Sequence, residues 1–124
     1  MTYRPHLIAV LLASAGVHAA LTPEHLDEAP TLGWLFLASV VVAVAIAGAV
    51  LVVPSRQMLL AAAAVLLTFA AAYAYTRLTG LEALGIPHEE PDRLGLATVA
   101  LELAGVGFAL SASRRAWPVL RRAT

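Results

Sequence analysis

Apolar residues in this 124-residue chain form four long runs that are separated by short polar segments. Two of them, 32–53 and 58–76, contain no charged residue, and 94–113 contains a single carboxylate. The first run, 7–21, is the shortest and can be extended to Tyr3. About 20 helical residues, each rising about 1.5 Å, cross the hydrocarbon core of a bilayer. The pattern predicts an all-α, integral membrane four-helix bundle, with spans at about 5–21, 31–53, 58–79 and 92–113.

Turn-forming residues divide the chain between these predicted spans, and Pro30 is one of the clearest of them. Thr22 followed by Pro23 has the pattern of a helix N-cap with proline at the first helical position. This pattern predicts a separate short helix over 23–28 in the first outer loop. Pro91 is expected to begin the fourth span in the same way.

The composition also indicates a chain that lies in a membrane. Hydrophobic residues make up 60% of it and charged residues only 13%, with a mean hydropathy of +0.83. An ordinary soluble domain carries about a quarter charged residues. No polar stretch is long enough to serve as an interdomain linker, so residues 1–124 are expected to form a single transmembrane domain.

The distribution of arginine predicts the orientation of the spans. With four spans, both termini and the second loop share one side of the membrane, and that side carries six arginines and no acid. The positive-inside rule then predicts that both termini are cytoplasmic and that the acidic loops face outward, in the cell inner (plasma) membrane. The basic carboxyl terminus, which has few aromatic residues, indicates contact with anionic lipid headgroups and no nucleic-acid partner. The six arginines are Arg4, Arg56, Arg114, Arg115, Arg121 and Arg122.

The first run has a second interpretation. Arg4, the apolar stretch 7–17 and the small-residue pattern around His18 also fit a secretory signal peptide with its cleavage site. We expect this run to remain as a span. Cleavage would leave the three other spans with the same sidedness, so the acidic loops would stay outside.

Three of the four histidines fall at or beside the predicted outer surface, together with carboxylates of the outer loops. Residues three or four apart share one face of a helix, and the fourth span is expected to lie beside the first. Histidine and carboxylate ligands suit a Zn, Cu or Fe ion, whereas the absence of cysteine excludes disulfides and thiolate ligands. The leading hypothesis is therefore a transition-metal site at the extracytoplasmic face, used in metal handling or redox chemistry. Its expected ligands are His18, His25 and His88, with Glu24, Glu28 and Glu89. The alternative is that these acids only stabilise helix amino termini.

Glu102 is the other candidate, because it lies roughly 16 Å along the fourth span from Pro91, near the bilayer centre. An ionised carboxylate at that depth costs about 2.5 kcal/mol or more, so it is expected to be protonated, paired or facing a polar cavity. A proton-coupled small transporter or channel that uses Glu102 is the second hypothesis. The structural alternative is a neutral Glu102 that hydrogen-bonds to Thr68 or Ser39 at a similar depth.

No catalytic or nucleotide-binding motif is present, so an enzyme is not indicated. A third hypothesis is an accessory or assembly subunit of a larger membrane complex, or a homo-oligomer. The stretches 18–34 and 87–102, and the use of arginine without lysine, resemble small four-span membrane proteins of high-GC bacteria. The lone membrane glutamate is similar to that of small multidrug-resistance transporters, but theirs belongs to the first span, and this first span has none.

Overall fold

The computed structural model describes residues 3–86 and 88–121. Four of its helices are long and apolar enough to cross a membrane, which confirms the all-α, four-helix prediction. In α4 the segment Arg93–Arg115 is long and apolar enough to span, and the helix itself continues to Arg121. The helices are α1 (Tyr3–Glu28), α2 (Pro30–Val52), α3 (Arg56–Leu78) and α4 (Arg93–Arg121), with a short 3-10 helix η1 (Glu82–Leu84) between α3 and α4.

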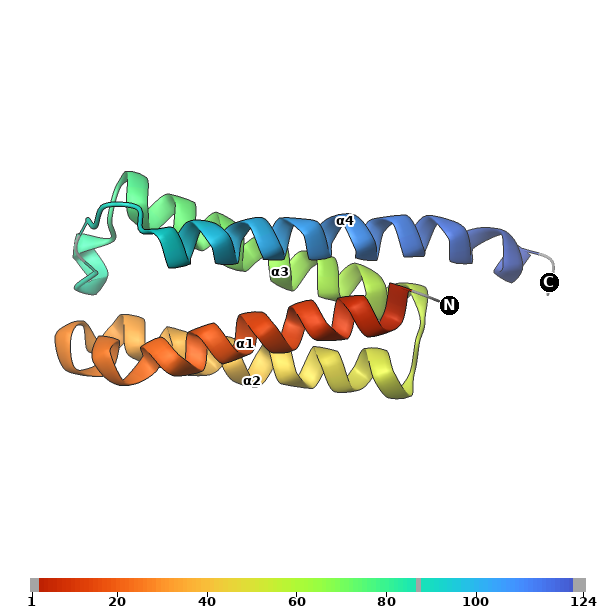
Figure 1. Cartoon of the computed structure of the whole chain (residues 1–124), viewed down its shortest axis with the longest axis horizontal. Coiled ribbons are helices and arrows are strands. Elements are labelled where there is room, and N and C mark those ends of the chain that lie inside the picture. The colour runs from red at the N-terminus through yellow and green to blue at the C-terminus, as the bar shows by residue number, and fades with distance from the viewer. Residues whose placement is uncertain (1–2, 87, 122–124) are drawn as a thin grey trace.

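The four helices form two hairpins, α1 with α2 and α3 with α4, which lie side by side (Figure 1). The two helices of each hairpin pack extensively against each other, and α1 also packs against α4. The contact between α2 and α3 is smaller. Both chain ends and the α2–α3 connection lie at one end of the bundle, and the other two connections lie at the opposite end (Figure 1).

Local capping explains where α3 and α4 begin and end. The hydroxyl of Ser55 accepts a hydrogen bond from the Met58 N–H (3.2 Å) at the start of α3. Gly80, in the left-handed region with φ +67°, follows the end of α3. At the start of α4 the carboxylate of Asp92 accepts from the Gly95 N–H (2.6 Å). The cap of α4 is therefore Asp92, and the prediction that Pro91 begins the helix is wrong.

The predicted short helix over 23–28 is not a separate element, because α1 continues through Pro23 to Glu28. The hydroxyl of Thr22 donates to the His18 carbonyl (2.7 Å) within the helix, so it does not cap a new one. Proline removes one N–H donor from a helix, and here the helix continues past that loss. As a result, Glu24 and Glu28 lie on the last turns of α1, which directly extend the first span.

An apolar core fills the half of the bundle that contains the chain ends. Its residues come from the first turns of α1 and α3 and the last turns of α2 and α4. Protein interiors of this kind are close-packed, so apolar side chains fill the space between the helices in this half. The core consists of Leu7, Val10, Leu11, Ala47, Val50, Leu59, Ala62, Ala63, Leu66, Ala109 and Ala112.

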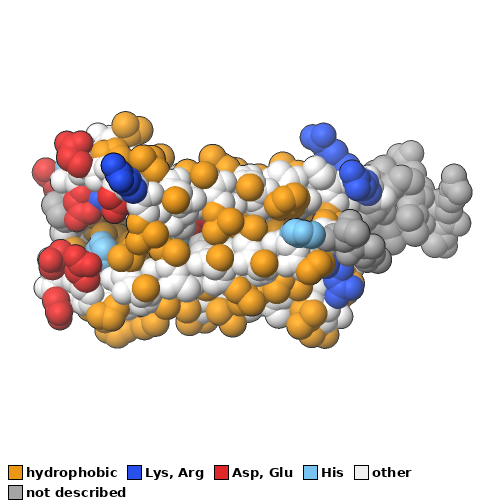
Figure 2. Space-filling view, in the orientation of Figure 1, with side chains coloured by type: hydrophobic (Ala, Val, Ile, Leu, Met, Phe, Trp, Pro, Cys, Tyr) orange, Lys and Arg blue, Asp and Glu red, His pale blue; other side chains and the backbone are white. Residues whose placement is uncertain are grey.

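Charged side chains are separated between the two ends of the bundle. Acidic side chains gather at the end with the α1–α2 and α3–α4 connections, and arginines are concentrated at the other (Figure 2). At that second end Arg4 donates to the carbonyl of Leu51 (2.5 Å) near the end of α2, where a positive charge is favourable. Arg122 lies outside the described residues, as does the side chain of Arg121.

Candidate functional site

A pocket of about 710 Å³ lies between the four helices in the acidic half of the bundle. It begins where the apolar core ends, so one half of the bundle is filled by apolar side chains and the other half contains the pocket. The lining residues of α1, α2 and α4 recur at helical spacing and form one face of each helix, whereas those of α3 cover a broader part of its surface. They are 17, 18, 21, 24, 25 and 28 on α1; 32, 35, 36 and 39 on α2; 68, 69, 71, 72, 73, 75, 76 and 77 on α3; and 95, 98, 99 and 102 on α4.

Glu102 lies in the wall of this pocket at its deep end, and only 1% of the residue is exposed. The Ser14 hydroxyl of α1 donates to Oε1 of Glu102 (2.6 Å). This hydrogen bond joins the carboxyl of Glu102 to another helix, α1. Because Glu102 also lines the pocket, its carboxyl can meet a proton or a ligand there.

The expected partners of Glu102, Thr68 and Ser39, are engaged elsewhere. Each hydroxyl donates to the carbonyl four residues earlier in its own helix, Thr68 to Ala64 (2.7 Å) and Ser39 to Leu35 (2.8 Å). Such bonds are the usual way in which a hydroxyl is satisfied inside a helix. The interhelical hydrogen bond of Glu102 that the sequence predicted does exist, but its partner is Ser14.

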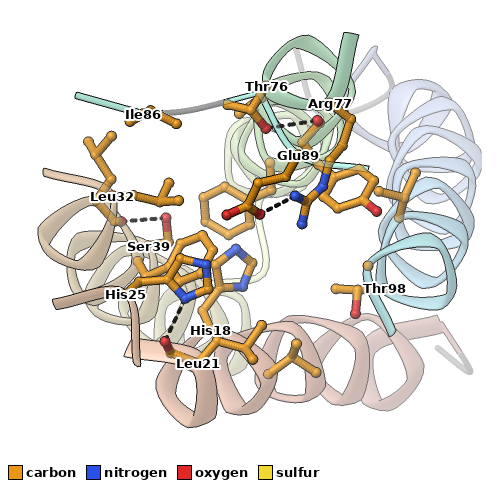
Figure 3. Close-up of a pocket in the computed structure, with 18 of the residues that line it drawn as sticks. His18, Leu21, His25, Leu32, Ser39, Thr76, Arg77, Ile86, Glu89 and Thr98 are labelled. Atoms are coloured by element: carbon orange, nitrogen blue, oxygen red, sulfur yellow. Dashed lines mark hydrogen bonds and ion pairs between the residues drawn. The ribbon is translucent and has the colours of Figure 1, made fainter. Parts of the chain in front are cut away.

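His18 and His25 lie on the α1 wall of the pocket (Figure 3). Nδ1 of His18 is 2.8 Å from the Ser14 carbonyl, and Nδ1 of His25 is 2.8 Å from the Leu21 carbonyl. A carbonyl oxygen only accepts, so Nδ1 carries the proton in both rings. In a neutral imidazole Nε2 then keeps its lone pair and can accept a proton or bind a ligand.

Two phenylalanines hold these imidazole rings in place. The ring of Phe36 lies 5.1 Å from that of His18 and 4.6 Å from that of His25, between ring centroids. Phe69 lies 5.0 Å from His18 on the side of α3. Tilted and edge contacts at these separations are favourable for aromatic rings. His18 therefore lies between α2 and α3, with its orientation fixed by both hairpins.

Arg77 stands near the mouth of the pocket and is paired with acids (Figure 3). It forms an ion pair with Glu89, and its Nη2 lies 3.9 Å from Oδ2 of Asp92. The guanidinium carbon also lies 4.9 Å from the centre of the Tyr73 ring. Only 15% of the Arg77 side chain is exposed, whereas 40% of the Glu89 side chain is, so the pair is buried on the arginine side and open to solvent on the carboxylate side. The positive charge of Arg77 is thus compensated by loop carboxylates next to α4.

Most of the residues that the sequence singled out belong to this pocket, but His88 does not. His88 is exposed, and its backbone lies against Gly80, where an added Cβ would be 2.8 Å from the His88 nitrogen. Within residues 3–86 and 88–121, no three histidine or acidic side chains lie close enough together to hold a metal ion. The members of the pocket wall are His18, His25, Glu24, Glu28, Glu89 and Glu102.

Sequence reasoning did not select Ser14, Phe36 or Phe69 as site residues. Ser14 precedes His18 by one turn of the helix, and this spacing is the one available signal for it. Phe36 and Phe69 lie in runs that are apolar on every side, so periodicity does not mark one of their faces as internal.

Comparison of the chain with protein-family models, with curated proteins and with solved structures finds no match. The functional argument therefore depends on the pocket and its side chains.

Proposed function

We propose that this protein is a proton-linked carrier for a small ligand, with Glu102 as the group that exchanges a proton for the ligand. The observation that supports this proposal most strongly is a carboxyl group, buried near the middle of a helix that can span the membrane, at the deep end of a pocket. Ionisable groups at such positions in membrane proteins commonly mark ion or substrate pathways. Its position in the pocket wall gives that group access to a proton or a ligand in the pocket.

The division of the bundle into two halves supports one-sided access to Glu102. Below the pocket, the apolar core that includes Leu59 and Leu66 separates Glu102 from the end with the chain termini. A carrier must expose its site to one side of the membrane at a time, and two hairpins that pack tightly at one end only can rock against each other. The limited contact between α2 and α3 is consistent with such a motion.

The proposal includes an orientation. The end that carries Arg4, Arg56, Arg114 and Arg115 faces the cytoplasm by the positive-inside rule, and the acidic mouth of the pocket faces outward. The chain is then a multi-pass protein of the plasma membrane that takes its ligand from the extracytoplasmic side.

Blocking the pocket provides a direct test. In liposomes that contain the purified protein and an internal pH dye, three aromatic probes of different charge are added outside: phenyltrimethylammonium, benzenesulfonate and benzyl alcohol. At least one probe is expected to move protons, and Thr98→Trp, which fills the pocket from α4, should abolish that movement. The matched control is Ala97→Trp, at an exposed neighbouring position outside the pocket wall. The proposal is wrong if no probe moves protons, or if both tryptophan variants behave like the parent.

Transition-metal binding in the same pocket is a second candidate function. It is favoured by the hydrogen bonds from Nδ1–H of His18 and His25 to backbone carbonyls, an arrangement typical of metal-ligating histidines, whose Nε2 binds the ion. To complete a site for Zn, Cu or Fe(II), Glu24 or Glu28 would have to move toward the two imidazoles, because no three such side chains of the described residues lie together as the helices stand.

Metal analysis tests this second candidate. Protein incubated with Zn(II) and passed through a desalting column is expected to retain one ion per chain. The double variant His18→Ala, His25→Ala should retain none, whereas His88→Ala, outside the pocket, should bind as the parent does. A parent protein without bound metal, or equal loss in the His88 variant, would contradict metal binding at this site.

A further inference from the structure

The walls of the pocket carry an excess of negative charge. Five carboxylates line it, and Arg77 is the one arginine among the described wall residues. That arginine is already paired with two of those acids. An anion would therefore meet no uncompensated positive charge in the pocket, whereas a cation would meet carboxylates at the mouth and at the deep end. The five acids are Glu24, Glu28, Glu89, Asp92 and Glu102.

The same pocket is apolar and aromatic between its mouth and its deep end. Phe36 and Phe69 face it from different hairpins, and Leu21, Leu32 and Val99 add aliphatic surface. Aromatic faces attract cations, and they do so more strongly where water is excluded. A bare inorganic ion would leave this surface exposed to water, but an organic molecule would cover it.

From this combination we infer that the ligand is an organic cation, an ammonium group attached to an apolar body. The inference rests on the proposed carrier function and names the chemical class of its ligand. The apolar body lies in the pocket against the wall formed by Phe36, Phe69 and the His18 ring between them. The charged nitrogen lies beside the carboxyl of Glu102.

The exchange at Glu102 balances charge without a further reactant. When the cation arrives, the protonated carboxyl releases its proton toward the mouth of the pocket, and the resulting carboxylate forms an ion pair with the ammonium group. When the cation leaves, a proton returns to the same oxygen. The hydrogen bond from Ser14 remains with the carboxylate in both states. The deep end of the pocket therefore carries no net charge in either the empty or the loaded protein.

Other ionisable groups that face the pocket come from α1, α3 and the loop before α4, whereas α2 contributes the uncharged Ser39. They are His18, Glu24, His25 and Glu28 on α1, Tyr73, Tyr75 and Arg77 on α3, and Glu89 and Asp92 in the loop. Glu102 differs from all of them in depth, since it alone lies at the level of Ser14 near the apolar core. A variant at Glu102 can thus be compared with variants nearer the mouth.

Binding measurements on the purified full-length protein test the inference. Phenyltrimethylammonium and benzenesulfonate have similar size and opposite charge, and benzyl alcohol is neutral. By calorimetry in detergent, the ammonium probe is expected to bind about tenfold or more tightly than either of the others, because only it gains the ion pair and the cation–π contact. In weakly buffered solution it should also release protons, and Glu102→Gln should lose both the affinity and the proton release. Glu82→Gln, at an exposed position outside the pocket, is the control.

The outcomes separate this inference from the proposed function. Equal or tighter binding of benzenesulfonate or benzyl alcohol would overturn the cation inference, even if that probe moved protons and so supported the carrier. Preferential binding of phenyltrimethylammonium that is lost in Glu102→Gln would support the cation inference, even if no proton crossed the liposome membrane and the carrier function failed.

Discussion

Replacing Glu102 by glutamine is expected to reduce probe-driven proton movement in liposomes to the level of protein-free liposomes. Glutamine has nearly the same size and keeps a carbonyl oxygen that can accept from the Ser14 hydroxyl, so the fold should be retained. It cannot take up or release a proton at neutral pH. The measurement is the change in internal pH after addition of phenyltrimethylammonium, with the amount of folded, reconstituted protein matched by size-exclusion chromatography and circular dichroism.

Two further variants make this result specific. Glu82→Gln removes an exposed acid outside the pocket and should move protons as the parent does. Ser14→Ala removes the single donor to Glu102, which is worth about 1 kcal/mol, and should change the proton movement roughly fivefold without abolishing it. Proton movement that persists in Glu102→Gln at the parent rate would refute a role for this carboxyl.

The sequence was sufficient to predict the four apolar helices and a carboxyl, that of Glu102, inside the last of them. Both conclusions depend on length and polarity along the chain, which are independent of how helices rotate against one another. The same is true of the concentration of acids at one end of the bundle, since it follows from the alternation of spans and loops.

Local signals around proline were less informative. Thr22 and Pro23 have the composition of a helix start, yet the Thr22 hydroxyl bonds to the His18 carbonyl and α1 continues. The first residue of α4 is Arg93, two residues after the expected Pro91, and Asp92 caps the helix. In both places a side-chain hydrogen bond decides whether a new helix begins, and several nearby residues could have formed such a bond.

The pairing of side chains across helices could not be predicted, because α2 is apolar on all sides and its inward face is not marked. Packing turns Phe36 toward His18 and His25, and it brings Ser14 rather than Thr68 to Glu102. His88 was expected beside the other histidines, but its backbone lies against Gly80, just after the end of α3, and His88 is not among the residues that line the pocket.

Gly33 is the position at which a small substitution is expected to affect both stability and the pocket. It lies where α2 crosses the end of α1, and an added Cβ would lie 2.6 Å from the Leu26 nitrogen and 2.7 Å from the Leu26 Cα. Both are backbone atoms, so the helices themselves must separate. Overpacking of this kind costs about 1–3 kcal/mol, and Gly33→Ala should lower the midpoint of thermal unfolding in detergent by roughly 5 to 10 °C.

The same separation should weaken ligand binding, because Leu26 is the neighbour of His25, and the contact between His25 and Phe36 crosses the α1–α2 interface. Gly48→Ala is the matched control on α2: an added Cβ there meets nothing within 4 Å, and alanine favours the helix. Its midpoint should be unchanged or slightly higher, with parental affinity for phenyltrimethylammonium. If Gly33→Ala unfolds and binds as Gly48→Ala does, the close contact between α1 and α2 does not set the geometry of the pocket.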